Sequence, residues 1–312
     1  MSEGPTVGPP SHIPVMPTEV AQRLALAPGQ TYLDCTAGLG GHAVVAAAAV
    51  GAGGRIILND VDPGNLERAK ATVGASGVPV VGMLGNFADI SYRMRDAGLV
   101  ADAILADLGF SSNQMEDGQR GLSFMRDGPL DMRLDPSLPT SAADLVNSLG
   151  EGELADLILE FGEDGGARRI ARKLVQVRTE GPIQTTARLA EAVRSAVPGQ
   201  RGSGIDPATK TFQALRIAVN DELGCLGALL KSIENEARKP GAWLRPGARV
   251  VFLTFHSLED RLVKRSFVGL VKAGLAAEIG DQGEGPTEAE TGVNPRARSA
   301  KVRAVRLIEK TG

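Results

Sequence analysis

The chain has 312 residues, 43% of them hydrophobic, which is enough for one large α/β domain plus a smaller one, so a folded enzyme-sized protein is expected. Its formal net charge of −3 argues against a protein that coats nucleic acid over its whole surface, because phosphate neutralisation needs basic side chains; any such contact should be a local patch. Two distant cysteines, three scattered histidines, no apolar leader and no apolar run of about 20 residues predict a protein of the reducing cytoplasm without disulfide, metal ion or membrane span.

Short apolar runs alternate with helix-length stretches through the first third of the chain. Residues 1–11 are rich in Gly, Pro and Ser and predict a flexible lead-in. The runs that follow predict four strands, Tyr32–Leu33, Arg55–Leu58, Val80–Leu84 and Ala103–Ala106. Strands that alternate with helices form right-handed βαβ units, so a parallel sheet is expected.

A fifth strand at 249–255 comes about 140 residues after the fourth, which is too far for one crossover helix. We therefore predict a discontinuous Rossmann-like α/β domain, 12–112 and 213–312, interrupted by a helical domain at 113–212. Within the insert, three apolar series at helical spacing predict helices around Ile158, Leu174 and Val193. Its segregated charges are typical of solvated helix faces, with an RNA-binding basic face as the alternative. A long amphipathic helix from Pro207 to Leu230 should lead back to the sheet, and 277–293 should be a loop.

A glycine turn, Asp34–His42, follows the first strand and predicts a nucleotide site, because glycines let the backbone approach a ligand at a helix N-terminus. Asp60 ends the second strand, where a carboxylate can accept both hydroxyls of a ribose. This spacing fits a dinucleotide or S-adenosylmethionine (SAM); the alternative is a packing turn plus a helix cap at Asp62. No glycine fills the third dinucleotide position after Gly41. SAM has no pyrophosphate, and Asp34 can accept its ammonium, so SAM is favoured.

Asp107 ends the fourth strand at the carboxyl edge of the sheet, where doubly wound folds bind their ligands. A carboxylate there can accept N–H protons from an exocyclic amine and localise its lone pair for attack on a methyl carbon. The alternative is that Asp107 caps a turn and contacts only the cofactor.

Three further segments offer substrate contacts. Residues 119–133 are dense in charge and glycine, as in a functional loop. His256 follows the fifth strand, where Ser257 or a neighbour would cap the next helix, although a structural histidine is an equal alternative. The tail 294–306 has basic residues and no acid, and its alternation predicts an edge strand. The candidate RNA contacts are Arg120, Arg126, Arg133, His256, Arg296, Arg298, Lys301 and Arg303.

Several strings together resemble the bacterial 16S ribosomal RNA cytosine-N4 methyltransferase family (RsmH, also called MraW). They are HIPVM from His12, GGH at Gly40, RGLSF and MRDGPLDMR within Asp107–Arg133, ATKTFQALRIAVNDEL from Ala208, FHSLEDRLVK from Phe255 and NPRARSAK from Asn294. The match runs from about residue 12 to 308. Carried over by position, the cofactor contacts are Gly40, Gly41, His42, Asp60, Phe87, Asp107 and Gln114.

The resemblance implies SAM-dependent methyl transfer to the exocyclic N4 amine of a decoding-region cytosine in 16S rRNA of the small ribosomal subunit, with 113–212 recognising substrate. It also points to a homodimer, which no feature of the sequence itself requires. The chain departs from the family at Asp206, usually a histidine, at Asp34–Leu39 and at Asp60–Pro63, where two arginines are lost. The alternatives are a SAM-binding, RNA-associated assembly factor without methylation and a nicotinamide-dependent oxidoreductase. The chain has no Tyr-x-x-x-Lys pattern for hydride transfer, which counts against the oxidoreductase.

Overall fold

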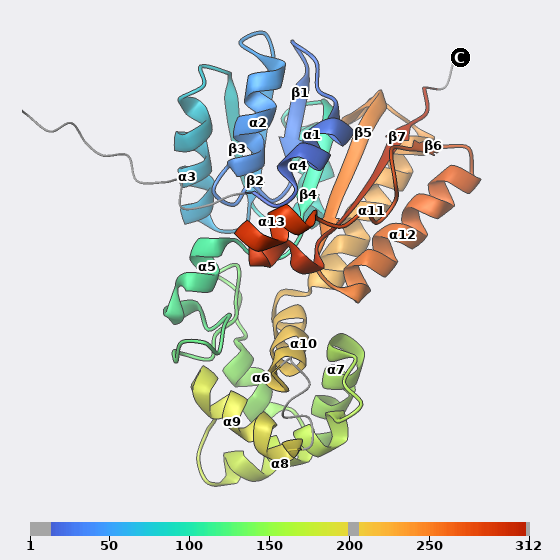
Figure 1. The fold of residues 1–312 in the computed structure, drawn as a ribbon. Coiled ribbons are helices and arrows are strands. Elements are labelled where there is room, and N and C mark those ends of the chain that lie inside the picture. Colours follow the sequence, from blue (N-terminus) through green and yellow to red (C-terminus); the bar gives the residue numbers. More distant parts are fainter. Residues whose placement is uncertain (1–13, 199–205, 310–312) are drawn as a thin grey trace, which may run out of the picture. The chain divides into compact units, whose positions relative to one another are not determined.

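The computed structural model describes residues 14–198 and 206–309 and divides the chain into two compact units (Figure 1). The first unit combines Met1–Gly109 with Leu226–Gly312, and the second is Phe110–Cys225. The second unit therefore extends further in both directions than the predicted 113–212. The expected lead-in at 1–11 lies outside the described residues.

A seven-stranded sheet forms the centre of the first unit. Its spatial order is β3-β2-β1-β4-β5-β7-β6, with β1 to β5 parallel and β7 antiparallel to both neighbours. The strands are β1 (Thr31–Asp34), β2 (Arg55–Asp60), β3 (Val80–Leu84), β4 (Ala101–Asp107), β5 (Leu244–Thr254), β6 (Ala276–Glu278) and β7 (Lys301–Leu307). The five strands predicted from the sequence, and the Rossmann-like α/β class, are confirmed. The strand order reverses between β1 and β4, and such a switch point is where open α/β sheets bind ligands.

The prediction of an edge strand in the basic tail is wrong. Strand β7 pairs with β5 from Arg249↔Arg306 to Thr254↔Lys301, and β6 pairs with its other side. The three-residue β6 is the edge, and it was too short to give a sequence signal.

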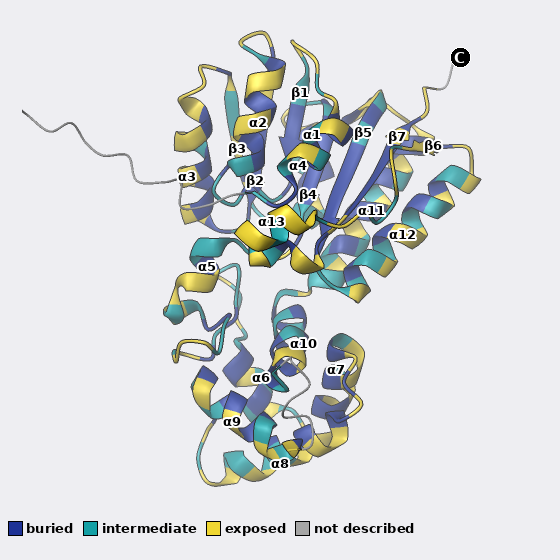
Figure 2. Ribbon diagram, viewed as in Figure 1, coloured by how far each residue is buried: buried dark blue, intermediate teal, exposed yellow. Residues whose placement is uncertain are grey.

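Helices cover both faces of the sheet because successive strand residues point to opposite sides. Ile56 packs with α1 (Pro17–Leu24), α2 (Gly41–Val50) and α3 (Pro63–Gly74). Ile57 packs with α4 (Ile90–Asp96), α12 (Ser257–Lys272) and the part of α11 (Glu222–Arg238) from Leu226 onward. The central strands are buried along almost their whole length (Figure 2). They are continuous apolar runs for this reason, as expected for a parallel sheet covered on both faces.

The second unit is helical and has its own core. Its helices are α5 (Ser112–Glu116), α6 (Ala142–Ser148), α7 (Glu151–Gly162), α8 (Ala167–Thr179), α9 (Thr186–Ala196) and α10 (Ala208–Asn220). The three helices predicted from apolar spacing correspond to α7, α8 and α9. Phe212 and Leu215 of α10 are buried in this core, which is why the unit extends beyond residue 212.

The prediction of a single helix from Pro207 to Leu230 is wrong, because the helix is interrupted at Asp221, between α10 and α11. Asp221 takes left-handed backbone angles with φ of 46°. The amide of Asn220 donates to the Met132 carbonyl at 2.8 Å, and its oxygen accepts from Leu134 N at 2.7 Å. These two tertiary bonds hold the last residue of α10 against the loop at Met132–Leu134, and the left-handed Asp221 ends the helix.

The segment predicted as a loop at 277–293 contains a short helix, α13 (Glu288–Val293), whose first turn is capped by Thr287. Its lack of buried residues left no apolar pattern to detect. Among the described residues, no helix combines the length and the apolar character that crossing a membrane requires.

Candidate active site

The turn after β1 brings backbone close to the carboxyl edge of the sheet in the first unit. Gly40 has φ of 86°, and a Cβ there would lie 3.2 Å from the Ala69 Cα of α3. Both constraints favour glycine. Gly41 begins α2, and a Cβ on it would lie 3.2 Å from the Pro14 side chain. The helix has no side-chain cap, so its N-terminus faces the edge without a competing acceptor.

Asp34 is buried beneath this turn. Its carboxyl group accepts from Tyr32 Oη and from Thr36 N, both at 3.2 Å, and burial raises its pKa to about 7. The expectation that Asp34 would meet the SAM ammonium is not supported, because only 1% of the residue is exposed. Its contacts assign it to holding the turn.

Asp60 connects the end of β2 to the same turn. One carboxylate oxygen accepts from Gly38 N and the other from Asp62 N, each at 2.8 Å. Asp62 itself accepts from Gly64 N and Asn65 N and caps α3, as the alternative reading of that residue predicted. The two neighbouring acids therefore have different tasks: Asp60 faces the turn, whereas Asp62 starts a helix.

Phe87 follows β3 in a short 3-10 helix, η1 (Phe87–Asp89), whose first residue is fixed by the Asn86 side chain accepting from Ala88 N. The ring is partly buried against the core. An aromatic ring at this position offers a flat apolar surface beside the edge of the sheet.

Asp107 lies at the end of β4, where its backbone N–H donates to Thr36 Oγ1 at 2.7 Å and so joins strand and turn. One carboxylate oxygen lies 3.7 Å from His42 Nε2, and the other is buried with no hydrogen-bond partner among the described residues. Burial and the charge of Asp34 raise the pKa of Asp107, Arg296 lowers it, and the net result is a pKa of about 8. A buried acceptor without a donor is costly, so the site is prepared for an incoming N–H group.

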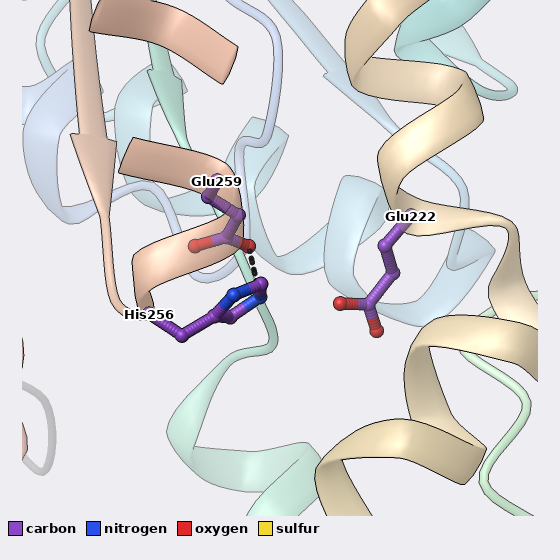
Figure 3. A group of neighbouring side chains, drawn as sticks. All are labelled: Glu222, His256 and Glu259. Atoms are coloured by element: carbon purple, nitrogen blue, oxygen red, sulfur yellow. Dashed lines mark ion pairs between the residues drawn. The ribbon is translucent and has the colours of Figure 1, made fainter. Parts of the chain in front are cut away.

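His256 and Glu259 form a second polar pair, at the end of β5 and the start of α12 (Figure 3). His256 Nε2 lies 3.1 Å from Glu259 Oε1. The other oxygen of Glu259 accepts from Phe255 N at 2.9 Å. Glu259 therefore ties the backbone that precedes α12 to the first turn of that helix. Sequence analysis missed Glu259, although an acid at the third helical position is a capping signal.

The basic residues of the tail have different surroundings. Arg296 is half-buried and near enough to lower the pKa of Asp107, whereas Arg298 is exposed. Lys301 Nζ lies 3.6 Å from an oxygen of Asp260. Arg303 is removed from the RNA candidates, because it is only 6% exposed and donates to both oxygens of Asp260 at 2.7 and 3.1 Å.

The remaining candidates belong to the second unit. Gln114 is buried in α5, where its carboxamide oxygen accepts from Ser111 N and Oγ. Arg126 is exposed and donates to the Glu116 carbonyl, and Arg120 is half-buried near the Arg133 carbonyl. Arg133 donates to both oxygens of Asp131 and to the Leu138 carbonyl, so its guanidinium mainly shapes the loop.

Comparison with known proteins identifies the family. Residues 10–308 match the family described as the MraW methylase family. The chain belongs to this family. It is 42% identical over 314 residues to the ribosomal RNA small subunit methyltransferase H of Symbiobacterium thermophilum, covering 94% of this chain and 96% of that protein. Proteins of the same name from Solibacter usitatus and Deinococcus radiodurans are each 44% identical, covering 95% and 94% of this chain and 99% and 88% of theirs.

As a MraW methylase, the protein is a methyltransferase whose cofactor is SAM. The first unit fits this cofactor: the N-terminus of α2, at the turn after β1, has no side-chain cap, and Asp107 keeps a buried acceptor oxygen. Asp60 as the acceptor of the ribose hydroxyls and Phe87 as the adenine contact stay predictions. When bound, SAM supplies a methyl group activated by its sulfonium. The family assignment also removes the oxidoreductase alternative.

Asp206 stands where the resemblance to the MraW family leads us to expect a histidine. Its carboxylate pairs with Arg194, with oxygen–nitrogen distances of 2.8 to 3.2 Å, and accepts from Ala208 N at the start of α10. The hydrogen bonds from Arg194 hold the pKa of Asp206 below its usual value. The negative charge that this departure introduces is therefore matched within the second unit.

Asp206→Ala is expected to lower the free energy of unfolding by about 1 kcal/mol, since it removes a helix-cap acceptor and a partly exposed ion pair. Urea unfolding followed by circular dichroism would measure the loss. Asp206→Asn keeps the cap acceptor and should lose less than half as much. Equal stability of wild type and Asp206→Ala would show that neither contact contributes.

Proposed function

We propose that this protein transfers the methyl group of SAM to the exocyclic N4 amine of a cytosine in the decoding region of small-subunit ribosomal RNA. The names of the relatives support ribosomal RNA of the small subunit as the substrate class. The observation that supports an amine as the methyl acceptor is the buried oxygen of Asp107, which lies at the carboxyl edge of the sheet and accepts no hydrogen bond from the described residues. The expected homodimer stays a prediction.

Methyl transfer to this amine mainly requires that the amine be held in the correct orientation. The lone pair of the amine is delocalised into the cytosine ring, and an acceptor bonded to one N–H proton favours the geometry in which the lone pair points at the methyl carbon. As the new N–C bond forms, the S–C bond of SAM breaks and its electron pair returns to sulfur. The nitrogen then releases one proton, which an ionised Asp107 can accept or pass to water.

Substrate contacts are proposed for the residues whose groups the structure leaves accessible. In the first unit these are Arg296, Arg298 and Lys301. His256 stays a prediction from the sequence, because its side chain is only 9% exposed. In the second unit Arg126 is the most exposed candidate, and the unit as a whole is proposed to recognise substrate. Gln114 remains a predicted cofactor contact.

The test is transfer of labelled methyl from SAM to small ribosomal subunits isolated from cells that lack this protein. Mass spectrometry of the digested RNA should identify N4-methylcytidine. Label in another nucleoside would overturn the N4 assignment, and label confined to DNA or a small amine would overturn the ribosomal substrate. SAM binding without any transfer would favour the assembly-factor alternative.

A further inference from the structure

The exposed side of α12 carries a row of basic residues that neither the cofactor site nor the tail candidates explain. From 261 to 277 the sequence contains four bases and no acid. The buried side of α12 presents Val263, Phe267 and Leu270 to the sheet. The exposed bases recur at helical spacing on the opposite side and consist of Arg261, Lys264, Arg265 and Lys272.

Three of these cations, Lys264, Arg265 and Lys272, differ from others on the surface of the first unit in their acidic partners. Among the residues that the structure describes, no carboxylate forms an ion pair with Lys264, Arg265 or Lys272. Elsewhere, Lys70 lies 2.8 Å from Glu67, and Glu234 pairs with both Lys231 and Arg238 at 2.9 and 2.8 Å. The α12 row is thus a concentrated positive field on a chain whose net charge is −3.

Helix stability does not account for the row. Lys272, in the last turn, interacts favourably with the helix dipole, but Lys264 and Arg265 lie in the middle of the helix, where that effect is small. Like charges three or four residues apart, such as Arg261 with Lys264 or Arg265, cost roughly 0.2–0.5 kcal/mol per pair. The arrangement reduces stability, and a polyanion bound along the helix would reverse that cost.

The row continues into the basic tail. Lys301 Nζ lies 3.6 Å from Asp260, in the first turn of α12, and Arg298 is exposed three residues earlier. At 1.5 Å per residue, Lys264 and Lys272 are about 12 Å apart along the helix axis. The basic residues therefore extend over a length that several successive phosphates of a nucleic-acid strand occupy.

We propose that the basic row of α12, Lys264, Arg265 and Lys272, binds the phosphate backbone of the substrate RNA outside the methylated nucleotide. This proposal rests on the proposed function for the identity of the RNA. An anionic membrane is a poorer match, because interfacial helices bury large apolar side chains beside their bases and the exposed large apolar residues of the described chain do not include any on α12. Backbone contacts of this kind position RNA without reading its sequence.

The test compares K264Q/R265Q/K272Q with the charge-matched control K70Q/K231Q/R238Q, whose three cations already have acidic partners. The α12 variant should raise KM for small ribosomal subunits by about ten-fold at 150 mM salt, and kcat and SAM affinity should stay within two-fold of wild type. The slope of log(kcat/KM) against log salt should become shallower by about 2 to 3, as for three lost phosphate contacts. The control should behave as wild type, and thermal unfolding should show both proteins folded.

A second measurement separates this proposal from the proposed function. The affinity of each variant for isolated 16S RNA can be measured by filter retention across a salt series, and this measurement does not require methyl transfer. Weaker RNA binding by the α12 variant alone would support phosphate binding by the basic row even if no methylcytidine formed. Equal RNA binding by both variants would overturn it, as would a loss confined to phosphatidylglycerol vesicles.

Discussion

Asp107→Asn is expected to slow methyl transfer strongly and, at the same time, to stabilise the protein near neutral pH. The change keeps the shape of the side chain but removes the carboxylate that would accept an amine proton. Loss of one oriented acceptor in a water-poor site lowers kcat by about 10²–10³-fold. SAM affinity should change much less, so the defect should appear in kcat during single-turnover methylation of small ribosomal subunits.

The stabilisation follows from the pKa of Asp107. Unfolded, this carboxyl group ionises above pH 3.8, whereas burial raises its pKa to about 8 in the folded protein. Between these values the native state binds more protons than the unfolded state, so stability falls as pH rises. Asp34, with a folded pKa of about 7, adds to the fall over pH 4 to 7. Asparagine cannot ionise, so the gain should be absent near pH 4, grow to about 1–3 kcal/mol by pH 8 and then level off.

Thermal unfolding of the two proteins between pH 4 and 9 measures this difference. Asp102, at the other end of β4, provides the control: its carboxylate accepts from Thr31 N at 2.8 Å and lies 3.2 Å from Arg245 Nε. Asp102→Asn should reduce stability by about 1 kcal/mol and retain methyl transfer. An Asp107→Asn protein that is less stable than wild type at pH 8 would contradict a high pKa, and one that stays active would remove Asp107 from the chemistry.

The same ionisation predicts the pH dependence of wild-type activity. If the carboxylate must be ionised to accept the N–H group, kcat/KM should rise about ten-fold per pH unit below the pKa of Asp107, near 8 in the free enzyme, and then become constant. The rise should be missing from the residual activity of Asp107→Asn. A profile that is flat from pH 6 to 9 would show that orientation needs no ionised group.

The parallel part of the sheet could be predicted from sequence because its strands are buried on both faces. Residues such as Ile56 and Ile57 pack into opposite cores, so the strand is a continuous apolar run that stands out between polar turns. Strand β7 was harder to place. Its alternating bases suggested an edge, but Arg303 is neutralised by Asp260, a residue 43 positions away whose contribution no local pattern could indicate.

Site residues could be predicted where backbone geometry limits the residue type. Gly40 needs a positive φ and close packing against Ala69, and Asp60 and Asp107 follow strands at the switch point. What local sequence does not show is how each charge is matched. Asp206 looked like a disruptive anion until its pairing with Arg194 was visible, because ion pairs depend on tertiary contacts.

Asp60→Asn is expected to weaken SAM binding by about 10²–10³-fold, as measured by isothermal titration calorimetry. Hydrogen bonds to a charged acceptor contribute about 1.5–3 kcal/mol each, and the ribose of SAM offers two hydroxyl donors. The carboxylate also accepts from Gly38 N, which fixes the turn on which the rest of the cofactor would lie. An amide replaces one acceptor by a donor, so it can satisfy neither role fully.

Asp62→Ala tests whether SAM affinity depends on direct contact with Asp60 or on the position of α3. Asp62 lies two residues further on and caps that helix through Gly64 N and Asn65 N. Its loss should cost about 1 kcal/mol of stability and leave SAM affinity within about three-fold of wild type. Comparable weakening in both variants would mean that SAM senses the position of the helix, and Asp60 would lose its assignment as the ribose acceptor. Weakening in Asp60→Asn alone, at equal or higher melting temperature than Asp62→Ala, would exclude placement of α3 as the cause and assign the effect to Asp60, through the ribose or through the Gly38 turn.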